Sequence, residues 1–230
     1  MGHAFRHSER RRIQLISKMV PGAGVKNVLD IGCGNGELSE ILVRRGMNVI
    51  STDLGFDSIR RASEKINARL SRRPRQDSPI RFVQGDIYRL PYDDASFDAV
   101  VASEIIEHLE NPREAFSEVA RVLKSGGYFI VATPYMEKLQ YTLCIHCNEK
   151  TPVNAHLHSF DENALTDMLS GAGLAADGSK KYSSKYAAMF GMAGLTFFLP
   201  YAFWRAVDSI LCGLLGKQSH IAIKAQRIDR

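Results

Sequence analysis

Three glycines at alternate positions, Gly32, Gly34 and Gly36, follow a short apolar run that ends at Asp30 and Ile31. Glycine permits a tight turn with positive φ and lets the backbone approach a ligand closely. The amphipathic stretch that follows the glycines predicts a helix whose first amide groups point at the same place. The pattern therefore predicts a binding site for a nucleotide-like molecule.

A second carboxylate supports this interpretation. The apolar run at 48–52 leads to Asp53, about twenty residues after the glycines, where doubly wound folds place an acid on the ribose hydroxyls of the ligand. The glycines alone would be a weak signal, because the same spacing occurs in ordinary turns. Together, the loop and Asp53 favour a ligand with free ribose hydroxyls.

These residues need a scaffold, and alternating apolar and amphipathic stretches supply one. The expected strands are Asn27 to Ile31, Asn48 to Thr52, Ile80 to Gln84, Ala99 to Ala102, Tyr128 to Thr133 and Ile221 to Ala225. The expected helices are Glu37 to Arg45, Ser58 to Leu70, Pro112 to Val122 and Asp161 to Gly171. This alternation predicts an α/β protein with a parallel sheet covered on both faces.

The composition suits one soluble domain: the 230 residues are 45% hydrophobic and 24% charged. No secretory signal is expected at the start, so the four cysteines indicate no disulfide framework, and a reducing cytoplasm is expected. The charge is mildly basic, 30 Lys and Arg against 25 Asp and Glu, with clusters at Arg6 to Arg12 and Arg69 to Arg75. No nucleic-acid module accompanies them, so no nucleic-acid partner is expected.

Further motifs follow the glycines in order: Asp53, Gly85-Asp86-Ile87, Leu90-Pro91, Ser96-Phe97-Asp98, Glu107-His108-Leu109 and Arg121 to Gly127. In this combination the chain resembles the class I S-adenosylmethionine-dependent methyltransferases, especially the small-molecule branch that includes the ubiquinone and menaquinone biosynthetic enzymes. The resemblance covers residues 25–135. It implies a Rossmann-like doubly wound sheet, mostly parallel with an antiparallel last strand. It also implies one methyltransferase domain over 1–230, with a substrate-side insert or lid within 136–218.

The resemblance further implies how the motif residues bind S-adenosylmethionine. Asp30 is expected to bind the amino group of the methionine moiety, directly or through a water, and Asp53 the ribose. Asp86 is expected to accept from the adenine amino group, with Ile87 donating from its backbone; alternatively, Asp86 only caps the following turn. The expected set is Asp30, Gly32, Cys33, Gly34, Asn35, Gly36, Asp53, Leu54, Asp86, Ile87, Ser103 and Glu104. The contacts of Asp53 are expected to be to ligand alone.

Methyl transfer from a sulfonium needs mainly alignment, because the cofactor already carries the leaving group. A base is needed only where the nucleophile must lose a proton. His108 is the best candidate in the motif region, since imidazole titrates near neutral pH and Glu104, one helical turn earlier, is placed to orient it. Alternatively, His108 caps a short helix or contacts the cofactor.

A possible metal site lies beyond the methyltransferase motifs. Cys144 and Cys147, followed by His156 and His158, offer the four donors that tetrahedral zinc prefers. A structural zinc held by these residues would pin the insert over the active site. The alternative is a helix-entry segment without metal, in which Asp161 caps the next helix.

The stretch from Ala187 to Trp204 is almost wholly apolar, but glycines and Pro200 interrupt it and the chain must return to the sheet. From Trp204 onward apolar residues recur at helical spacing, and Asp208 and Ser209 are expected on the opposite face. This predicts a hydrophobic lid or a membrane-surface element. An ordinary helix covering the core has the same pattern.

The function predicted is S-adenosylmethionine-dependent methylation, at oxygen or carbon, of a small hydrophobic or lipid-like acceptor. Enzymes of this superfamily that methylate the amino group of adenine or glutamine carry an Asn/Asp-Pro-Pro-aromatic motif after the fourth strand. This chain has Ala102 to Ile105 there, which disfavours methylation of nucleic-acid amino groups. The alternatives are a non-catalytic cofactor-binding regulatory protein and an RNA or protein methyltransferase. The expected location is the cytoplasm, with peripheral binding to the inner face of a membrane as a further expectation.

Overall fold

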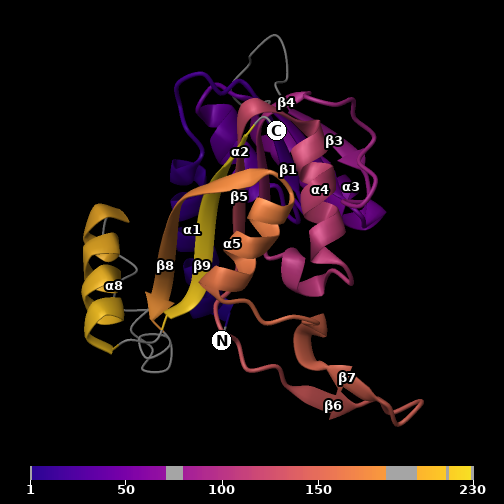
Figure 1. Ribbon diagram of the computed structural model, residues 1–230, viewed down its shortest axis with the longest axis vertical. Helices are drawn as coiled ribbons and strands as arrows, with labels where there is room; N and C mark the ends of the chain where they lie inside the picture. The colour runs from indigo at the N-terminus through magenta and orange to yellow at the C-terminus, as the bar shows by residue number, and fades with distance from the viewer. Residues whose placement is uncertain (1, 71–79, 185–200, 216–217, 229–230) are drawn as a thin grey trace.

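The computed structural model describes residues 2–70, 80–184, 201–215 and 218–228, and its centre is a seven-stranded sheet of order β3-β2-β1-β4-β5-β9-β8 (Figure 1). Five strands run parallel: β3 (Ile80–Gln84), β2 (Asn48–Asp53), β1 (Asn27–Ile31), β4 (Phe97–Ser103) and β5 (Leu123–Pro134). The last strand, β9 (Gln218–Arg227), is antiparallel to both of its neighbours, β5 and β8 (Leu174–Ser184). The predicted sheet, mostly parallel with an antiparallel last strand, is confirmed.

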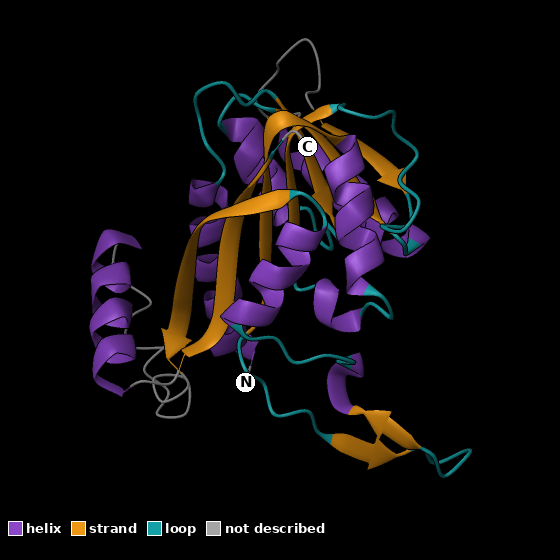
Figure 2. Cartoon of the chain, viewed as in Figure 1, coloured by secondary structure: helices purple, strands orange, loops and turns teal. Residues whose placement is uncertain are grey.

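Helices cover both faces of this sheet (Figure 2). One face carries α4 (Pro112–Val122) and α5 (Glu162–Gly171); the other carries α1 (Gly2–Met19), α2 (Glu37–Arg44) and α3 (Phe56–Leu70). Because successive side chains of a strand point to opposite faces of the sheet, each strand contributes side chains to two hydrophobic cores. Leu29 of β1 packs in the core beneath α4 and α5, and its neighbour Val28 packs in the core on the opposite face. The fold is therefore doubly wound.

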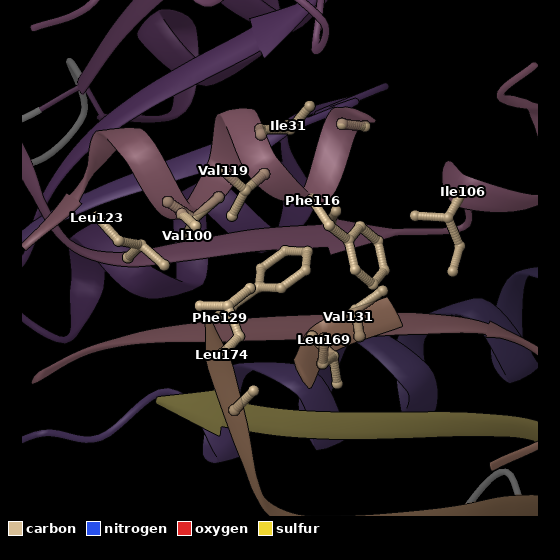
Figure 3. Close-up of a cluster of buried hydrophobic side chains, with 14 of the residues drawn as sticks. Ile31, Val100, Ile106, Phe116, Val119, Leu123, Phe129, Val131, Leu169 and Leu174 are labelled. Atoms are coloured by element: carbon tan, nitrogen blue, oxygen red, sulfur yellow. The ribbon is translucent and has the colours of Figure 1, made fainter. Parts of the chain in front are cut away.

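The core beneath α4 holds the two strands that carry part of the candidate site (Figure 3). Phe116 of α4 meets Phe129 of β5 edge to face, with ring centroids 5.3 Å apart, and both side chains are fully buried. Val100 of β4 and Val131 of β5 lie in the same cluster. Burying an aromatic side chain of this size stabilises a fold by about 1.5–3 kcal/mol. This packing holds β4 and β5 in place.

The sequence did not predict α1, β8 or a small hairpin formed by β6 (Tyr141–Leu143) and β7 (Lys150–Pro152). The hairpin extends away from the sheet beyond the end of β5 (Figure 1). Two short 3-10 helices also form: η1 (Ile106–His108) after β4, where a short helix at His108 was one alternative, and η2 (Val153–Ala155) after the hairpin, which was not predicted. The sequence of β8 has few apolar residues, and its pairing with β9 makes it a strand.

The predicted amphipathic helix does form, as α8 (Tyr201–Leu215), which begins three residues before Trp204 and contacts β8. The predicted orientation of its polar face is wrong at Asp208, which is 5% exposed and accepts from the amide of Ser183 at 3.2 Å, while Ile210 is 60% exposed. The amide of an edge strand needs an acceptor, and Asp208 supplies it. Residues 187–200 lie outside the described part, and none of the helices described is long and apolar enough to cross a membrane.

Candidate active site

The glycine-rich loop folds over the ends of β1 and β2. The amides of Gly32 and Cys33 donate to the carbonyl oxygen of Thr52 at 2.7 and 3.2 Å. Gly32 has a φ of +68°, and a Cβ at this position would lie 1.9 Å from Cδ1 of Ile105. Only glycine fits there, because any side chain would meet both backbone strain and a clash. The loop is thereby placed directly against the segment that follows β4.

Asp30 lies beneath the first turn of α2, where its side chain is 2% exposed. Its carboxylate accepts from the hydroxyl of Ser39, which in turn accepts from the hydroxyl of Ser51 at 2.8 Å. Burial raises the pKa of Asp30 to about 7, and the charge of Asp53 adds to this, while the Ser39 bond opposes it. The N-cap residue of α2 is Gly36, which has no side chain to cap the first amides of the helix.

Asp53 stands at the end of β2 and holds the loop in place. Its Oδ2 accepts from the amide of Gly34 at 3.2 Å, and its Oδ1 accepts from the amide of Gly55 at 2.9 Å. The prediction that its contacts are to ligand alone is therefore wrong, since β2 and the glycine loop converge on this carboxylate. Next to it, Leu54 is 70% exposed.

Asp86 follows β3, at the same edge of the sheet as Asp53. The two are linked through Gly85, whose amide donates to the carbonyl oxygen of Asp53 at 3.1 Å. One carboxylate oxygen of Asp86 accepts from the amide of Tyr88 at 3.0 Å, so this side chain caps the turn. Ile87 is buried beside it. The adenine contact of Asp86 stays a prediction.

The loop's other predicted residues differ in exposure. Cys33 is buried, and burial raises the pKa of its thiol, with a further contribution from the charge of Asp30. Asn35 is exposed. The sheet thus brings the loop, Asp53 and Asp86 to one edge, formed by the carboxyl ends of β1, β2 and β3, as open α/β folds do for ligands.

Ser103 and Glu104 stand where β4 ends, and Glu104 has a φ of 58°. One oxygen of Glu104 lies 3.3 Å from Nη1 of Arg12 and 3.5 Å from Nε2 of His220. Burial alone would raise the pKa of Glu104, but the His220 contact and the charge of Arg12 outweigh it and lower that pKa. Glu104 therefore pairs with α1 and β9, and the prediction that it orients His108 is wrong.

Glu107, three residues after Glu104, is a buried carboxylate with 1% exposure. Its Oε2 accepts from the hydroxyl of Thr133 at 2.9 Å, and its Oε1 is buried without a hydrogen-bond partner in the described part of the chain. Burial raises the pKa of Glu107 to about 7, and the neighbouring charge of Glu104 contributes to this rise. Its carbonyl oxygen accepts from the amides of Leu157 and His158 at 2.7 and 3.3 Å. These bonds connect η1 to the segment between β5 and α5, which we call the insert.

His108 and His156 complete a cluster with Glu107. Nδ1 of His108 lies 3.1 Å from the carbonyl oxygen of Ala155, and Nδ1 of His156 lies 2.5 Å from Oε2 of Glu137. The two imidazole rings meet edge to face with centroids 4.9 Å apart. One donor atom from each of Glu107, His108 and His156 lies within 4.8 Å of the other two. We call these three residues the Glu-His cluster.

The predicted zinc ligands do not come together. Cys144 and Cys147 are free thiols at the end of the β6–β7 hairpin, whereas His158 bonds through Nε2 to the carbonyl oxygen of Leu109 at 2.8 Å. Within the described ranges, the metal-like grouping that contains His156 includes neither cysteine. The zinc set of Cys144, Cys147, His156 and His158 is therefore wrong, because the hairpin carries the thiols away from the histidines.

The residues that sequence reasoning missed come from distant elements. Glu107 belongs to one of the motifs but was not predicted to have a role, and its spacing from Glu104 was the one local signal. Arg12 of α1 and His220 of β9 reach Glu104 only through the fold. Glu137, which holds His156, stands just after β5. No sequence pattern names these partners, because each contact joins separate elements.

A cavity of about 570 Å³ lies at the other end of the strands. Asn27, Asn48 and Phe97, which line it, are the first residues of β1, β2 and β4. The glycine loop and Asp53 follow the opposite ends of β1 and β2, so this cavity is separate from the candidate site.

The chain is similar to known methyltransferases. A family profile described as a methyltransferase domain matches residues 29–131. A Mycobacterium tuberculosis protein named as a probable S-adenosylmethionine-dependent methyltransferase is 30% identical over 165 residues, which cover 71% of this chain and 54% of that protein. The ubiquinone biosynthesis O-methyltransferase of Xylella fastidiosa is 36% identical over 122 residues, which cover 53% of this chain and 47% of that protein. The chain spans about half the length of the curated relatives it matches.

Solved structures show the same fold. The crystal structure of an S-adenosylmethionine-dependent methyltransferase from Mesorhizobium loti superposes with a TM-score of 0.65 at 18% identity, covering 93% of this chain and 96% of that one. At this identity the likeness speaks for the fold alone, and it agrees with the sheet described above.

Proposed function

Because the chain belongs to the class I S-adenosylmethionine-dependent methyltransferases, we propose that it transfers a methyl group to a hydroxyl oxygen of a small, hydrophobic acceptor. One observation carries this proposal. Ile105 packs against Gly32 of the cofactor loop, and the Glu-His cluster begins two residues later. A polar cluster that contains the buried carboxylate of Glu107 is thus held beside the place where the loop would bind the cofactor.

The glycine loop, Asp30 and Asp53 form the cofactor half of the site, and these residues fit S-adenosylmethionine. At Gly32 the space that a side chain would need is filled by Ile105, so the backbone of the cofactor loop is held in one place. Asp53 fixes the loop and stands at the strand end where ribose hydroxyls are bound in this fold. Asp30 would face the amino group of the methionine moiety. When bound, the cofactor supplies a methyl group already activated on a sulfonium.

The second half of the site would position the acceptor. Methylation of a hydroxyl oxygen forms an O–CH3 bond, breaks an S–CH3 bond and releases the hydroxyl proton, so an acceptor for that proton is required. Buried Glu107, with exposed His108 and half-buried His156 beside it, provides such polar groups next to the cofactor loop. The chain's part is to align the two reactants and exclude water, which accounts for most of the catalysis in such a displacement.

An apolar acceptor agrees with what surrounds the cluster. Met136 and Leu157 on the insert are 59% and 41% exposed, although their amides are held by backbone hydrogen bonds to Phe160 and Glu107. The Xylella fastidiosa relative is named as an O-methyltransferase of ubiquinone biosynthesis, and that name supports oxygen as the acceptor atom. A lipid-like acceptor presented at a membrane would also suit Phe203 of α8, which is 65% exposed.

The decisive experiment is an acceptor screen with methyl-labelled S-adenosylmethionine. We would incubate the purified protein with hydroxylated quinone precursors, other phenols, lipid extract, RNA and protein, and identify the labelled product and atom by mass spectrometry. Label on the oxygen of a small hydrophobic compound is the expected result. Label on RNA or protein, or cofactor binding without transfer to any fraction, would overturn the proposal in favour of one of the alternative functions.

A further inference from the structure

The Glu-His cluster is built from two segments that are distant in sequence. Glu107 and His108 belong to η1, whereas His156 follows η2 in the insert after β5. Their donor atoms lie within 4.8 Å of one another, so one small ion placed among them would touch all three. Two imidazoles and a carboxylate are a donor set that suits divalent first-row transition cations and leaves coordination positions open.

Both histidines are held in the way that metal-ligating histidines are held. Nδ1 of His108 faces the carbonyl oxygen of Ala155, and Nδ1 of His156 faces the carboxylate of Glu137. Each contact fixes the proton on Nδ1, which leaves the Nε2 lone pair as the available donor. Partners of this kind orient imidazole ligands and make them more basic. A carboxylate on one ring and a backbone carbonyl on the other form a complete second layer of support.

The third member carries an independent sign of a missing partner. Glu107 is 1% exposed, and its Oε1 has no hydrogen-bond partner among the described residues, although a buried carboxylate oxygen is costly to leave unsatisfied. The carboxylate of Glu104, close enough to influence Glu107 electrostatically, also has a buried oxygen without a partner. Arg12 and His220 bond to the other oxygen of Glu104. A cation beside Glu107 would supply the partner that its Oε1 lacks among the described residues.

Backbone strain marks the same place. Glu104 has a φ of 58° where β4 ends, and Ala155, whose carbonyl orients His108, has a φ of 56°. Residues other than glycine adopt this conformation at a cost of about 1–3 kcal/mol, and such strain gathers at functional sites. Here it lies on both of the segments that form the cluster.

We propose that Glu107, His108 and His156 bind a divalent first-row transition cation on the acceptor side of the methyl-transfer site. The exposure of His108 provides a path for the ion to enter. Resting on the proposed function, the cation would use an open position to bind the hydroxyl oxygen of the acceptor. Coordination makes a hydroxyl more acidic, so its proton is lost to solvent more readily before the oxygen takes the methyl group.

The test uses the full chain and Mn²⁺, whose free aqueous form is counted by electron paramagnetic resonance. We expect one Mn²⁺ per chain. Glu107→Gln and His156→Gln should weaken binding by at least about tenfold, the lower end of what even an indirect change in such a site produces. Glu137→Gln, which changes only the support of His156, should weaken it by about 10–100-fold.

Two control variants check that the ion is held by the Glu-His cluster and by no other group of the insert. His146→Gln removes an exposed histidine of the hairpin, and the paired change Cys144→Ser with Cys147→Ser removes the thiols. Both should leave Mn²⁺ binding unchanged. Calorimetric titration of every variant with S-adenosylhomocysteine shows whether the cofactor half is still folded, so a variant that has lost its fold is recognised.

Stoichiometric Mn²⁺ that is lost in the Glu107 and His156 variants, with cofactor binding intact, supports the proposal. No binding at micromolar protein and Mn²⁺ with or without S-adenosylhomocysteine, or binding that the cluster variants leave unchanged, overturns it. Neither measurement uses an acceptor or turnover. A failure here therefore leaves the proposed methyl transfer standing, and a failure of the acceptor screen leaves the cation site standing.

Discussion

The two halves of the candidate site are built in different ways. The cofactor half is local: the glycine loop, Asp30 and Asp53 belong to one strand-helix-strand unit, and β1 pairs directly with β2. The acceptor half is assembled from η1, the insert, α1 and β9, which the chain brings together only when the whole sheet has formed. Binding of the cofactor and choice of the acceptor can therefore be disturbed separately.

The most severe change should be Gly32→Ala, which strikes the contact between the two halves. The new methyl group would overlap Ile105 at a residue with φ +68°, so we expect the free energy of unfolding to fall by about 2–6 kcal/mol and cofactor binding to be lost. Thermal melts and calorimetry with S-adenosylhomocysteine measure both. Gly24→Ala is the control, since Gly24 has φ +78° with nothing within 4 Å, and it should show the strain alone.

The next largest effect is expected for Glu107→Gln, which should impair methyl transfer without changing cofactor binding. We expect the rate of methyl transfer to fall by about 100-fold or more, because a buried polar group of the acceptor half is changed, while S-adenosylhomocysteine binds as before. Steady-state kinetics and calorimetry give the two numbers. Glu110→Gln, at a carboxylate three residues further on, should change neither. Equal losses of rate and cofactor affinity in Glu107→Gln would show that the halves are not independent.

Asp53→Ala should act on the cofactor half and on its architecture. It removes the acceptor for the amides of Gly34 and Gly55, so we expect cofactor affinity to fall by about 10–100-fold, together with a lower melting temperature. Asp53→Asn keeps one acceptor oxygen, so its cofactor affinity should lie between those of the unchanged protein and of Asp53→Ala. An affinity unchanged in calorimetry would refute the role of this carboxylate.

The smallest effect expected is a pH dependence of the cofactor half. Burial raises the pKa of Asp30 to about 7, so the ionised fraction that can bind a ligand amino group, and with it the affinity for S-adenosylhomocysteine, should rise about tenfold from pH 6 to pH 8. Calorimetry in buffers of different ionisation enthalpy measures the affinity and the proton released. Asp30→Asn should remove the dependence.

The same pKa has an opposite consequence for stability. The unfolded chain loses the Asp30 proton near its ordinary pKa of 3.8, whereas the folded chain keeps it until about 7. The free energy of unfolding should therefore decline as pH rises between these values and level off above 7. Chemical denaturation across this range, compared with Asp30→Asn, checks the sign.

What could be predicted from the sequence follows the same division. The glycine loop, Asp53 and the parallel strands were predicted because their signals lie within short stretches, and hydrophobic periodicity reports burial directly. The Glu-His cluster was not, because His108 and the carbonyl of Ala155 are 47 residues apart in the chain. Asp208 was placed on the wrong face because its partner is the amide of an edge strand, which no helical pattern reveals.

The insert between β5 and α5 carries His156 and the hairpin but contributes no strand to the seven-stranded sheet. Descendants of this chain can thus lengthen, trim or exchange that segment while the hydrophobic layers under α4 and α2 stay as they are. The choice of methyl acceptor can therefore change in evolution while the binding of the methyl donor stays the same.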